Sequence, residues 1–474
     1  MIRKTDPQTV APYLIDASNY SGGCASEAVI PENLDELIGF LRANRQPITV
    51  SGAGTGVTAS RIPSSGIVVS LERFKTIGEI ADGSVEVGAA VSLRDLQEFL
   101  QDTPYFYPPN PTETLASLGG TLATNASGSR SYKFGVTRDF VLEAQIVLAD
   151  GRALRLARGA KIDRPLECEG GPPIEFPHTR YESPRCKNAA GYYVRPGMDW
   201  LDLFIGSDGT LGIMTGARLK LLPRPADFLS GVLFFDGEEP CWRLAASLRE
   251  PDRQGISPCS LEYFDSFSLD RLRRKFPNVP GRARAALFFE QDVAERRNYE
   301  PALEAWFDYL NAREVLLDDS WFARDARDVR AFHEFRHELP QMLNEENGRL
   351  GRIKVGTDMA VADEHFMEMM RFYRNVLSAS GIEYVVFGHI GDNHLHVNLL
   401  PEEGQVGKAG EVYQTLVDKV LEWNGTVSAE HGIGKLKKKY YRQMVGERAL
   451  EELKRIKKAL DPNLILGIGN TFDI

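Results

Sequence analysis

Three histidines close together in the chain, His389, His394 and His396, are the residues best suited to metal chemistry. Their apolar segment alternates as a β-hairpin does, with a turn at Asp392 and Asn393, residues that tolerate left-handed backbone. In that hairpin His389 lies directly across from His396, with Cβ atoms about 5 Å apart. Two imidazoles at this spacing can bind one divalent ion, so we expect a metal site with a further ligand from elsewhere.

The segment Ser428–Gly434 offers that further ligand. It carries Glu430 and His431 between a predicted strand and a glycine turn. Histidine combined with carboxylate suits Zn²⁺, Mn²⁺ or Fe²⁺, and the spacing does not choose among them. His394 and Asn398 project from the same strand face as His396 because side chains alternate along a strand. Asn398 is a candidate to bind substrate.

Three glycine-rich segments could hold phosphate: Val50–Gly56, Ser117–Gly128 and Gly206–Ile213. Alternating glycines let successive N–H groups face one concavity, where a pyrophosphate can bind, although one such loop alone fits a tight turn equally well. The usual dinucleotide fingerprint fails, because Val57 stands at its third glycine and no crossover helix fits before Gly66. NAD is therefore disfavoured. The candidate cofactor-binding residues are Ser51, Gly52, Ala53, Gly54, Thr55, Gly56, Ser117, Gly119, Gly120, Thr124, Asn125, Gly128, Ile213 and Asn470.

The elements that position these residues are of two kinds. Before Leu222 we expect short strands and few helices, among them a helix from Ser92 to Gln101. Proline in Leu222–Pro225 ends a strand, and beyond it strands and helices alternate, as in a sheet covered on one face by helices. We therefore expect an α+β protein with domains at 1–222, 223–434 and 435–474, and an irregular insertion at 165–184. Further strands are expected at 47–50, 66–71, 85–88, 140–148, 231–235 and 285–289, and further helices at 241–249 and 299–311.

Composition excludes several classes of protein. The 474 residues are 43% hydrophobic and carry a net charge of −10, which fits a globular protein and argues against binding nucleic acid through a general positive field. Five widely spaced cysteines with no Cys-x-x-Cys indicate neither a disulfide framework nor an iron–sulfur cluster. No apolar stretch approaches the roughly 18 residues of a membrane helix, and no signal-type core follows Met1, so a cytoplasmic protein is expected.

The glycine segments, together with Pro108–Pro111, Gly135–Asp139 and Lys187–Tyr192, resemble the vanillyl-alcohol oxidase-type flavoproteins. Within them the chain most resembles the FAD-linked D-2-hydroxy acid dehydrogenases, which act on D-lactate, glycolate or D-2-hydroxyglutarate. The resemblance implies a two-part FAD domain, a substrate domain with an antiparallel sheet and helices, and a C-terminal segment that returns to the flavin. Non-covalent FAD is expected, because residues 1–177 contain no histidine and Thr55 stands where some relatives place a tethering one.

The resemblance also implies roles for the second half. Positions matching His389, His396 and Glu430 bind a divalent metal in many members of that family, and the position matching His431 is the candidate base. His394 replaces an asparagine common in relatives, so it could add a ligand or line the pocket.

Substrate binding is implied for two cations. Arg336 matches the family's substrate-binding arginine, whose planar fork binds a carboxylate with two bonds. Lys354 resembles a second cation, although its spacing is longer than in some relatives. Two positions depart from the family: His337 replaces a glutamate common in relatives, and Pro340 replaces a hydroxyl residue seen in some members that hold a larger diacid. These departures favour D-lactate or a similar monoacid.

These residues together predict oxidation of a D-2-hydroxy acid to the 2-oxo acid. Hydride would pass to flavin N5, with Arg336 binding the substrate and His431 taking the proton. Electrons would leave to a separate acceptor, a quinone, a cytochrome or an electron-transfer flavoprotein, and a homodimer is expected. A D-2-hydroxyglutarate or glycolate dehydrogenase, a non-redox enzyme like alkyldihydroxyacetonephosphate synthase, and a non-catalytic flavin-binding subunit remain alternatives. The basic run Lys435–Arg442 is interpreted as a solvated helix face, with weak membrane-surface contact as the alternative.

Overall fold

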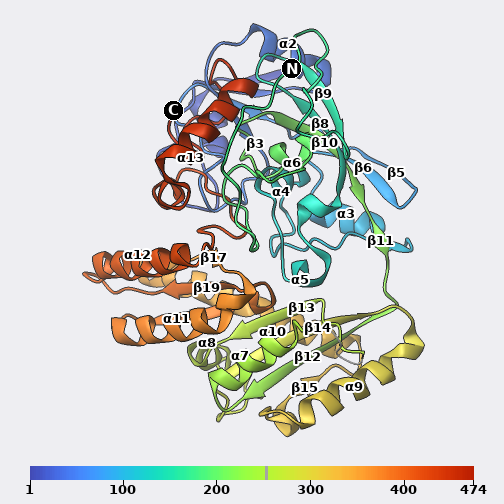
Figure 1. The fold of residues 1–474 in the computed structure, drawn as a ribbon, viewed down its shortest axis with the longest axis vertical. Coiled ribbons are helices and arrows are strands. Elements are labelled where there is room, and N and C mark those ends of the chain that lie inside the picture. The colour runs from blue at the N-terminus through green and yellow to red at the C-terminus, as the bar shows by residue number, and fades with distance from the viewer. Residues whose placement is uncertain (251–254) are drawn as a thin grey trace.

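The computed structural model describes residues 1–250 and 255–474. Its elements form two lobes (Figure 1), one built from the first half of the chain and the other from most of the second half. The last helix, α13, Lys438–Leu460, lies beside the first lobe. The fold class predicted from the sequence is therefore confirmed: α+β, with a C-terminal segment that returns to the front of the chain.

The first lobe contains two small sheets. One has strand order β1-β2-β4-β3, with β2, β4 and β3 parallel, and the other is an antiparallel sheet of order β5-β6-β10-β8-β9. A short ribbon of β7 with β11 leads out of this lobe. The strands are β1 Ile2–Lys4, β2 Glu27–Ile30, β3 Ile48–Ser51, β4 Ile67–Ser70, β5 Ile77–Ala81, β6 Ser84–Gly88, β7 Tyr105–Phe106, β8 Val141–Val147, β9 Ala153–Ala157, β10 Ile213–Lys220 and β11 Leu222–Pro223.

The helices of this lobe are short and begin where the sequence supplies a cap. The predicted helix near Ser92 is α3, and Ser92 and Asp95 form a reciprocal capping box at its start. Residues 158–199, all of them described, contain no helix or strand, as expected for the insertion. The helices are α1 Pro7–Val10, α2 Leu34–Ala43, α3 Leu93–Leu100, α4 Leu118–Thr124, α5 Ser131–Phe134 and α6 Trp200–Phe204.

The second lobe is built on one antiparallel sheet. Its strand order is β15-β12-β14-β13-β18-β19-β16, and β17 also pairs with β19. The strands β13 and β14 are buried along nearly their whole length, and each carries a buried carboxylate among its apolar side chains, Glu262 and Glu290. The strands are β12 Asp227–Phe235, β13 Ser260–Phe264, β14 Ala285–Val293, β15 Trp321–Phe322, β16 Val355–Gly356, β17 Met359–Ala360, β18 Tyr384–Gly388 and β19 His394–Leu399.

The remaining helices lie against this sheet, except α13, which lies beside the first lobe. The C-terminal tail after α13 returns to the first lobe, where Leu466 bridges Ile48 of β3 in parallel. Among the described residues no helix is both long and apolar enough to cross a membrane. The helices are α7 Glu238–Ser247, α8 Ser266–Leu272, α9 Tyr299–Asn311, α10 Ala326–Leu350, α11 Phe366–Ser380, α12 Val406–Glu422 and α13 Lys438–Leu460.

Candidate active site

The histidine hairpin forms as expected, but its register differs from the prediction. His396 of β19 pairs with Phe387 of β18, not with His389. The turn is longer than two residues, because a 3-10 turn covers Ile390–Asp392 and Asn393 takes the left-handed conformation. His389 therefore lies just outside β18 and accepts a backbone hydrogen bond from His394 N at 3.2 Å.

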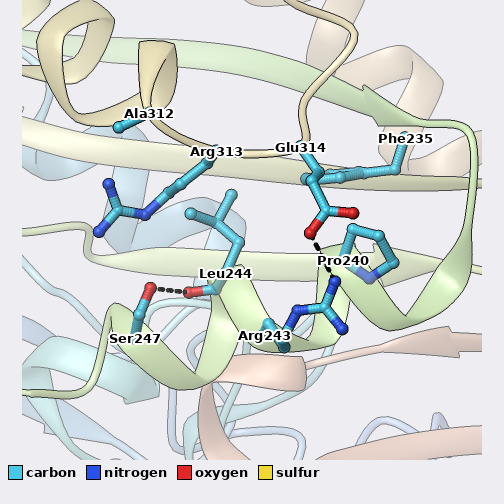
Figure 2. Close-up of a pocket in the computed structure, with 8 residues that line it drawn as sticks. All are labelled: Phe235, Pro240, Arg243, Leu244, Ser247, Ala312, Arg313 and Glu314. Carbon is cyan, nitrogen blue, oxygen red and sulfur yellow. Dashed lines mark hydrogen bonds and ion pairs between the residues drawn. The ribbon is translucent and has the colours of Figure 1, made fainter.

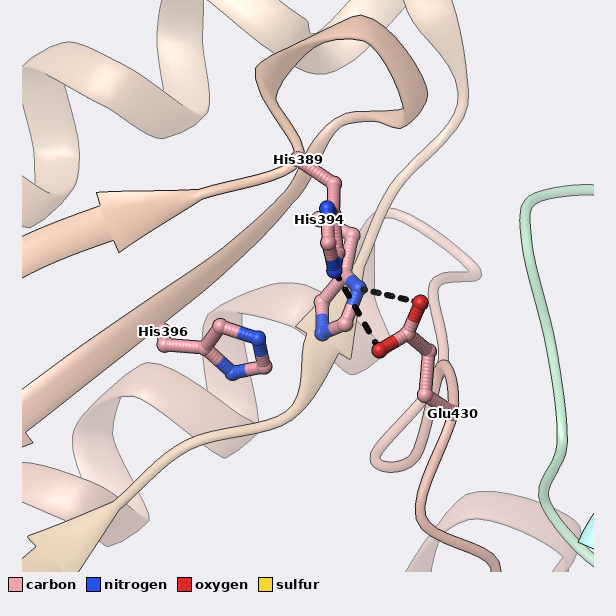
Figure 3. A group of neighbouring side chains, drawn as sticks. All are labelled: His389, His394, His396 and Glu430. Carbon is pink, nitrogen blue, oxygen red and sulfur yellow. Dashed lines mark ion pairs between the residues drawn. The ribbon is translucent and has the colours of Figure 1, made fainter. Parts of the chain in front are cut away.

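The three imidazoles nevertheless gather into one cluster with Glu430 (Figure 3). One ligand atom from each of His389, His394, His396 and Glu430 lies within 4.8 Å of the others. The ring centroids of His389 and His396 are 5.7 Å apart. Such a group of nitrogen and oxygen atoms has the size and chemistry of a divalent metal site. A second group, Asp358, His396 and His431, shares His396 with the first.

Glu430 joins this cluster to the first lobe. Its Oε2 lies 3.3 Å from His389 Nε2, and its Oε1 lies 2.6 Å from the ammonium of Lys187. Ser127 Oγ donates to Oε1 at 2.8 Å. Burial alone would raise the pKa of Glu430, but His389 and Lys187 hold that pKa well below its usual range, so the carboxylate is charged.

Asp358 holds the loop that carries Glu430 and His431. Its carboxylate accepts hydrogen bonds from the backbone N–H of Glu430 at 3.1 Å and of His431 at 3.0 Å. Ser428 Oγ and Lys437 Nζ also donate to Asp358 Oδ2, each at 2.6 Å. Because these donors surround a carboxylate that is only 1% exposed, they fix the direction of both side chains of the loop.

Glu262 of β13 lies between the metal cluster and Arg336. Its Oε1 is 2.6 Å from His389 Nδ1, and its Oε2 is 3.4 Å from Arg336 Nε. Burial alone would lower the pKa of His389, but Glu262 and Glu430 raise it to about 9. Glu262 therefore orients the imidazole and compensates the charge of the buried guanidinium.

His431 lies between Asp358 and His396. Its Nδ1 lies 3.3 Å from Asp358 Oδ2, and its ring stacks on His396 with centroids 5.6 Å apart. Desolvation of the partly buried ring lowers the pKa of His431 to about 4, although Asp358 opposes that shift. The imidazole is thus neutral at physiological pH and can accept a proton.

The two predicted substrate cations do not come together. Arg336 is buried on α10, where its Nη1 donates to His337 Nε2 at 2.6 Å. Lys354 is exposed, and its Nζ donates to Asn344. Asn344 is eight residues after Arg336 on α10, which corresponds to a helical rise of about 12 Å. Asn398 is buried, and its amide donates to the carbonyl of His396 at 3.3 Å.

The predicted cofactor segments meet in the first lobe. Ser117 caps α4, and its hydroxyl accepts from Ala53 N at 3.4 Å, which joins the first two glycine segments. Asp208 of the third segment donates its N–H to the carbonyl of Ala123 in α4. Asn470 of the tail donates to the carbonyl of Asp208 at 3.3 Å. Ile213 lies in the core of the first lobe, in one cluster with Ile48 and Leu466.

The loop after β3 is open and rich in glycine. Gly54 has a φ of +83°, a conformation that other residues rarely adopt. The backbone N–H groups of Gly54, Thr55 and Gly56 donate no hydrogen bond to any of the described residues. In α4, a Cβ added to Gly119 would lie 2.7 Å from Ala89 Cβ, so only glycine allows this helix to pack so closely there. Free N–H groups in an open glycine loop are what a phosphate requires.

The two predicted sites face each other. The carbonyl of His431 accepts from Thr58 Oγ1 at 3.3 Å, and Gly434 N donates to Asp208 Oδ2 at 2.9 Å. With the bond from Ser127 to Glu430, residues of the second and third glycine segments touch the loop at residues 428–434, as does Thr58, two residues after the first segment. The loop therefore lies at the junction of the predicted cofactor segments and the imidazole cluster.

A shallow hollow elsewhere carries none of these groups. It has a volume of about 240 Å³ and lies between α7 and the chain that follows α9 (Figure 2). Arg243 and Glu314 form an ion pair across it at 2.7 Å. It is separate from the site described above, and none of the predicted site residues lines it.

Comparison with known families identifies the chain. Residues 26–157 match the model of the FAD binding domain, and residues 230–471 match that of the FAD linked oxidases, C-terminal domain. The chain belongs to the FAD-linked oxidases. FAD is therefore its cofactor and oxidoreduction its class of reaction, as the resemblance implied. The second match spans both the predicted substrate domain and the C-terminal segment, so the boundary at residue 434 stays a prediction.

Curated relatives cover nearly the whole chain at modest identity. The glycolate oxidase subunit GlcD of Bacillus subtilis is 26% identical over 97% of this chain and 92% of that protein. A D-lactate dehydrogenase of Anaerostipes hadrus is 27% identical over 94% and 88% of the two chains. The D-2-hydroxyglutarate dehydrogenase of Stutzerimonas stutzeri is 24% identical over 99% and 95%.

Solved structures confirm the fold. The 4-ethylphenol oxidase of Gulosibacter chungangensis aligns with a TM-score of 0.67 at 15% identity, covering 99% of this chain and 94% of that one. An alkyldihydroxyacetonephosphate synthase aligns with a TM-score of 0.65 at 14% identity, covering 98% and 81%. At such low identity these structures establish the architecture of this FAD-linked oxidase and not its substrate.

Sequence reasoning misses three charged residues of the site: Lys187, Glu262 and Asp358. Each is buried and bonded to a predicted site residue. Two features of the sequence could have identified these residues. Lys187 and Asp358 lie inside motifs that resemble the family, and Glu262 interrupts an apolar strand. The basic run after Gly434 is also only partly a solvated face, because Lys437 pairs with Asp358 and Lys435 with Asn470.

Proposed function

We propose that this FAD-linked oxidase converts a small D-2-hydroxy acid, such as D-lactate, to the 2-oxo acid and passes the electrons to a separate acceptor. One observation carries the proposal. The loop with Glu430 and His431 bonds to Thr58 and Ser127 of the FAD-domain half while its side chains join the imidazole cluster. Cofactor and acid-binding groups are thereby adjacent, which oxidation at a C–H bond requires.

Arg336 binds the substrate carboxylate in this proposal. Its guanidinium is only 8% exposed, and Glu262 and His337 contact its Nε and Nη1. Burial and the neighbouring Arg336 lower the pKa of His337 to about 4, so a neutral His337 accepts the Nη1 hydrogen. Two contacts hold the fork in place and leave Nη2 for a carboxylate oxygen. Lys354 is a weaker candidate, because it is exposed and bonded to Asn344.

His431 takes the proton of the 2-hydroxyl. Asp358 bonds its backbone and lies beside its Nδ1, so the ring is held in one orientation. Bound FAD supplies the hydride acceptor for the substrate carbon. With the proton on His431 and the carboxylate on Arg336, the chain provides the remaining two functions of the oxidation.

A divalent ion fits the imidazole cluster. Both ring nitrogens of the buried His394 lack a hydrogen-bond partner of good geometry in the described part of the chain, and Glu430 is charged beside them. His389, His396 and Glu430 would hold the ion, as the resemblance implies. Such an ion supplies Lewis acidity that lowers the pKa of a coordinated hydroxyl.

Relatives favour this substrate class over the alternatives. Those named above are described as a glycolate oxidase subunit, a D-lactate dehydrogenase and a D-2-hydroxyglutarate dehydrogenase. A monoacid is favoured because Pro340 replaces a hydroxyl residue seen in some relatives that hold a larger diacid, and His337 replaces a glutamate common in relatives. FAD is held non-covalently, since no histidine precedes residue 178.

The direct test is anaerobic mixing of the purified protein with D- and L-2-hydroxy acids, followed by flavin absorbance. We expect D-lactate to bleach the flavin and L-lactate not to, and a chelator to slow the bleaching. If none of the acids bleaches the flavin, the proposal is wrong. Reoxidation by a quinone, a cytochrome or an electron-transfer flavoprotein then identifies the acceptor class.

The variant Arg336→Lys tests the carboxylate site. Because an ammonium cannot contact Glu262, His337 and the substrate carboxylate at once as the planar guanidinium does, kcat/KM for D-lactate should fall at least about 10-fold, mainly through KM. The matched control is Arg352→Lys, since Arg352 bonds Glu383 away from the cluster. Equal losses in both variants would contradict the role of Arg336. Steady-state kinetics with an artificial acceptor measure both.

A further inference from the structure

We infer that His394 is a fourth protein ligand of the divalent ion, which makes the site a set of three imidazoles and one carboxylate. The inference rests on the proposed function, which places an ion at His389, His396 and Glu430. His394 stands where relatives commonly have asparagine, so a nitrogen ligand here belongs to this chain and not to the motif it resembles.

The position of His394 satisfies the geometry of a ligand. Its side chain is fully buried, and its ring centroid lies 5.3 Å from that of His389 and 4.6 Å from that of His396 (Figure 3). Its Nδ1 lies 4.0 Å from Glu430 Oε1. One ligand atom of each of the four residues is within 4.8 Å of all the others. With small side-chain movements, all four atoms can coordinate one ion at ordinary metal–ligand distances.

The partners of His394 leave its inner nitrogen unsatisfied without an ion. Its Nδ1 has no hydrogen-bond partner within the described residues, whereas its Nε2 lies 2.9 Å from Asp358 Oδ1. A buried polar nitrogen without a partner is costly, and such groups in folded proteins usually contact a ligand, an ion or water. The nitrogen that faces Glu430 is therefore available to a cation.

All three imidazoles share one outer arrangement. His389 Nδ1 lies 2.6 Å from Glu262, His394 Nε2 lies 2.9 Å from Asp358, and His396 Nδ1 lies 3.3 Å from the carbonyl of Thr357. An acceptor next to the outer nitrogen favours the proton there and leaves the lone pair of the inner nitrogen free. This is the environment that metal-binding histidines have, and His394 has it as fully as the two predicted ligands.

The additional imidazole changes the chemistry of the site. Three nitrogens and one oxygen favour Zn²⁺, Fe²⁺ or Co²⁺ over Mg²⁺ or Mn²⁺, which prefer oxygen. Four protein ligands also leave fewer positions for substrate oxygen than three would. The four residues would therefore hold the ion tightly before substrate arrives.

The test uses the full-length flavoprotein, stripped of metal by a chelator and then titrated with Zn²⁺ against a chromophoric competitor. Wild type is compared with His394→Asn, which restores the residue common in relatives. The control is His178→Asn, because His178 is exposed and lies far from His394 in the sequence. Co²⁺ loading gives a visible spectrum that reports ligand number and type independently of turnover. Flavin absorbance and melting temperature verify folding. If His394→Asn fails to fold, His394→Gln is measured in its place.

We expect His394→Asn to weaken Zn²⁺ binding at least about 10-fold, to weaken Mn²⁺ binding less, and to change the Co²⁺ spectrum. His178→Asn should match wild type in all three. If His394→Asn or His394→Gln binds Zn²⁺ and Co²⁺ as wild type does, the inference is overturned.

A further variant, His389→Ala, separates this failure from failure of the proposed function. Loss of Zn²⁺ binding only in His389→Ala would refute the role of His394 and leave the three-ligand site intact. If wild type binds neither ion, or if His389→Ala binds as well as wild type, both the inference and the metal part of the proposed function are wrong.

Discussion

Single residues of this site act mostly through their neighbours. Asp358 is not one of the proposed substrate-binding residues, yet it bonds the backbone of both Glu430 and His431 and faces His394 and Lys437. One buried carboxylate thereby sets the direction of the proposed base and of a proposed metal ligand. A change at Asp358 should consequently disturb chemistry more than flavin binding, because its partners lie on the metal side of the junction.

Asp358→Asn tests this positioning role. The amide keeps the shape but presents N–H groups to donors and removes the charge that pairs with Lys437. Turnover per bound flavin should fall about 10- to 100-fold, as for other outer-shell partners of metal ligands. Asp418→Asn, at an exposed position of α12, is the matched control. Wild-type turnover in Asp358→Asn, measured with flavin content by absorbance, would exclude the role.

At the scale of elements, local signals predict much of the structure. Ser92 and the helical spacing after it predict α3, and alternation predicts the strands on either side of the histidine turn. The register of that hairpin could not be predicted, because a 3-10 turn and Asn393 lengthen the connection. Glu262 and Asp358 were missed for a different reason: they reach the cluster from separate strands or loops, and only the assembled sheet brings them there.

The helix α8 gives a pH prediction of its own. Asp265 caps it by accepting from Ser268 N at 2.8 Å, and its other carboxylate oxygen has no partner in the described structure. Burial raises the pKa of Asp265 to about 7, whereas an unfolded aspartate titrates near 4. Between these values the folded state binds more protons, so stability falls as pH rises from about 4 to about 7.

Asp265→Asn should remove that dependence while keeping the cap, because asparagine caps helices as well as aspartate does. Relative to wild type, the variant should gain stability as pH rises through this window, by at most about 1.4 kcal/mol per pH unit. Melting temperatures of the two proteins at a series of pH values measure the difference. Curves that stay parallel from pH 5 to pH 8 would show that Asp265 is ionised throughout.

On the scale of the whole molecule, residues 127–133 join the two lobes. Besides Ser127 with Glu430, Ser131 donates to Asp392 and Lys133 pairs with Asp292. Arg130 binds Glu290 of β14 with two bonds of 3.2 Å. The site lies between the lobes, so its geometry depends on this segment as much as on its own residues.

The pair of Arg130 and Glu290 makes that dependence measurable. Glu290 is 1% exposed, so Arg130→Met leaves a buried carboxylate whose remaining partner is His333, and should cost roughly 3–5 kcal/mol. Arg155→Met, which breaks the exposed pair with Glu86, should cost less than about 1 kcal/mol. Because apolar residues can replace a buried ion pair, Arg130→Met with Glu290→Met should melt above Arg130→Met alone. Thermal melting, monitored by flavin release, compares all three variants. A double variant no more stable than Arg130→Met would mean that loss of Arg130 does not leave Glu290 as a buried, unpaired charge.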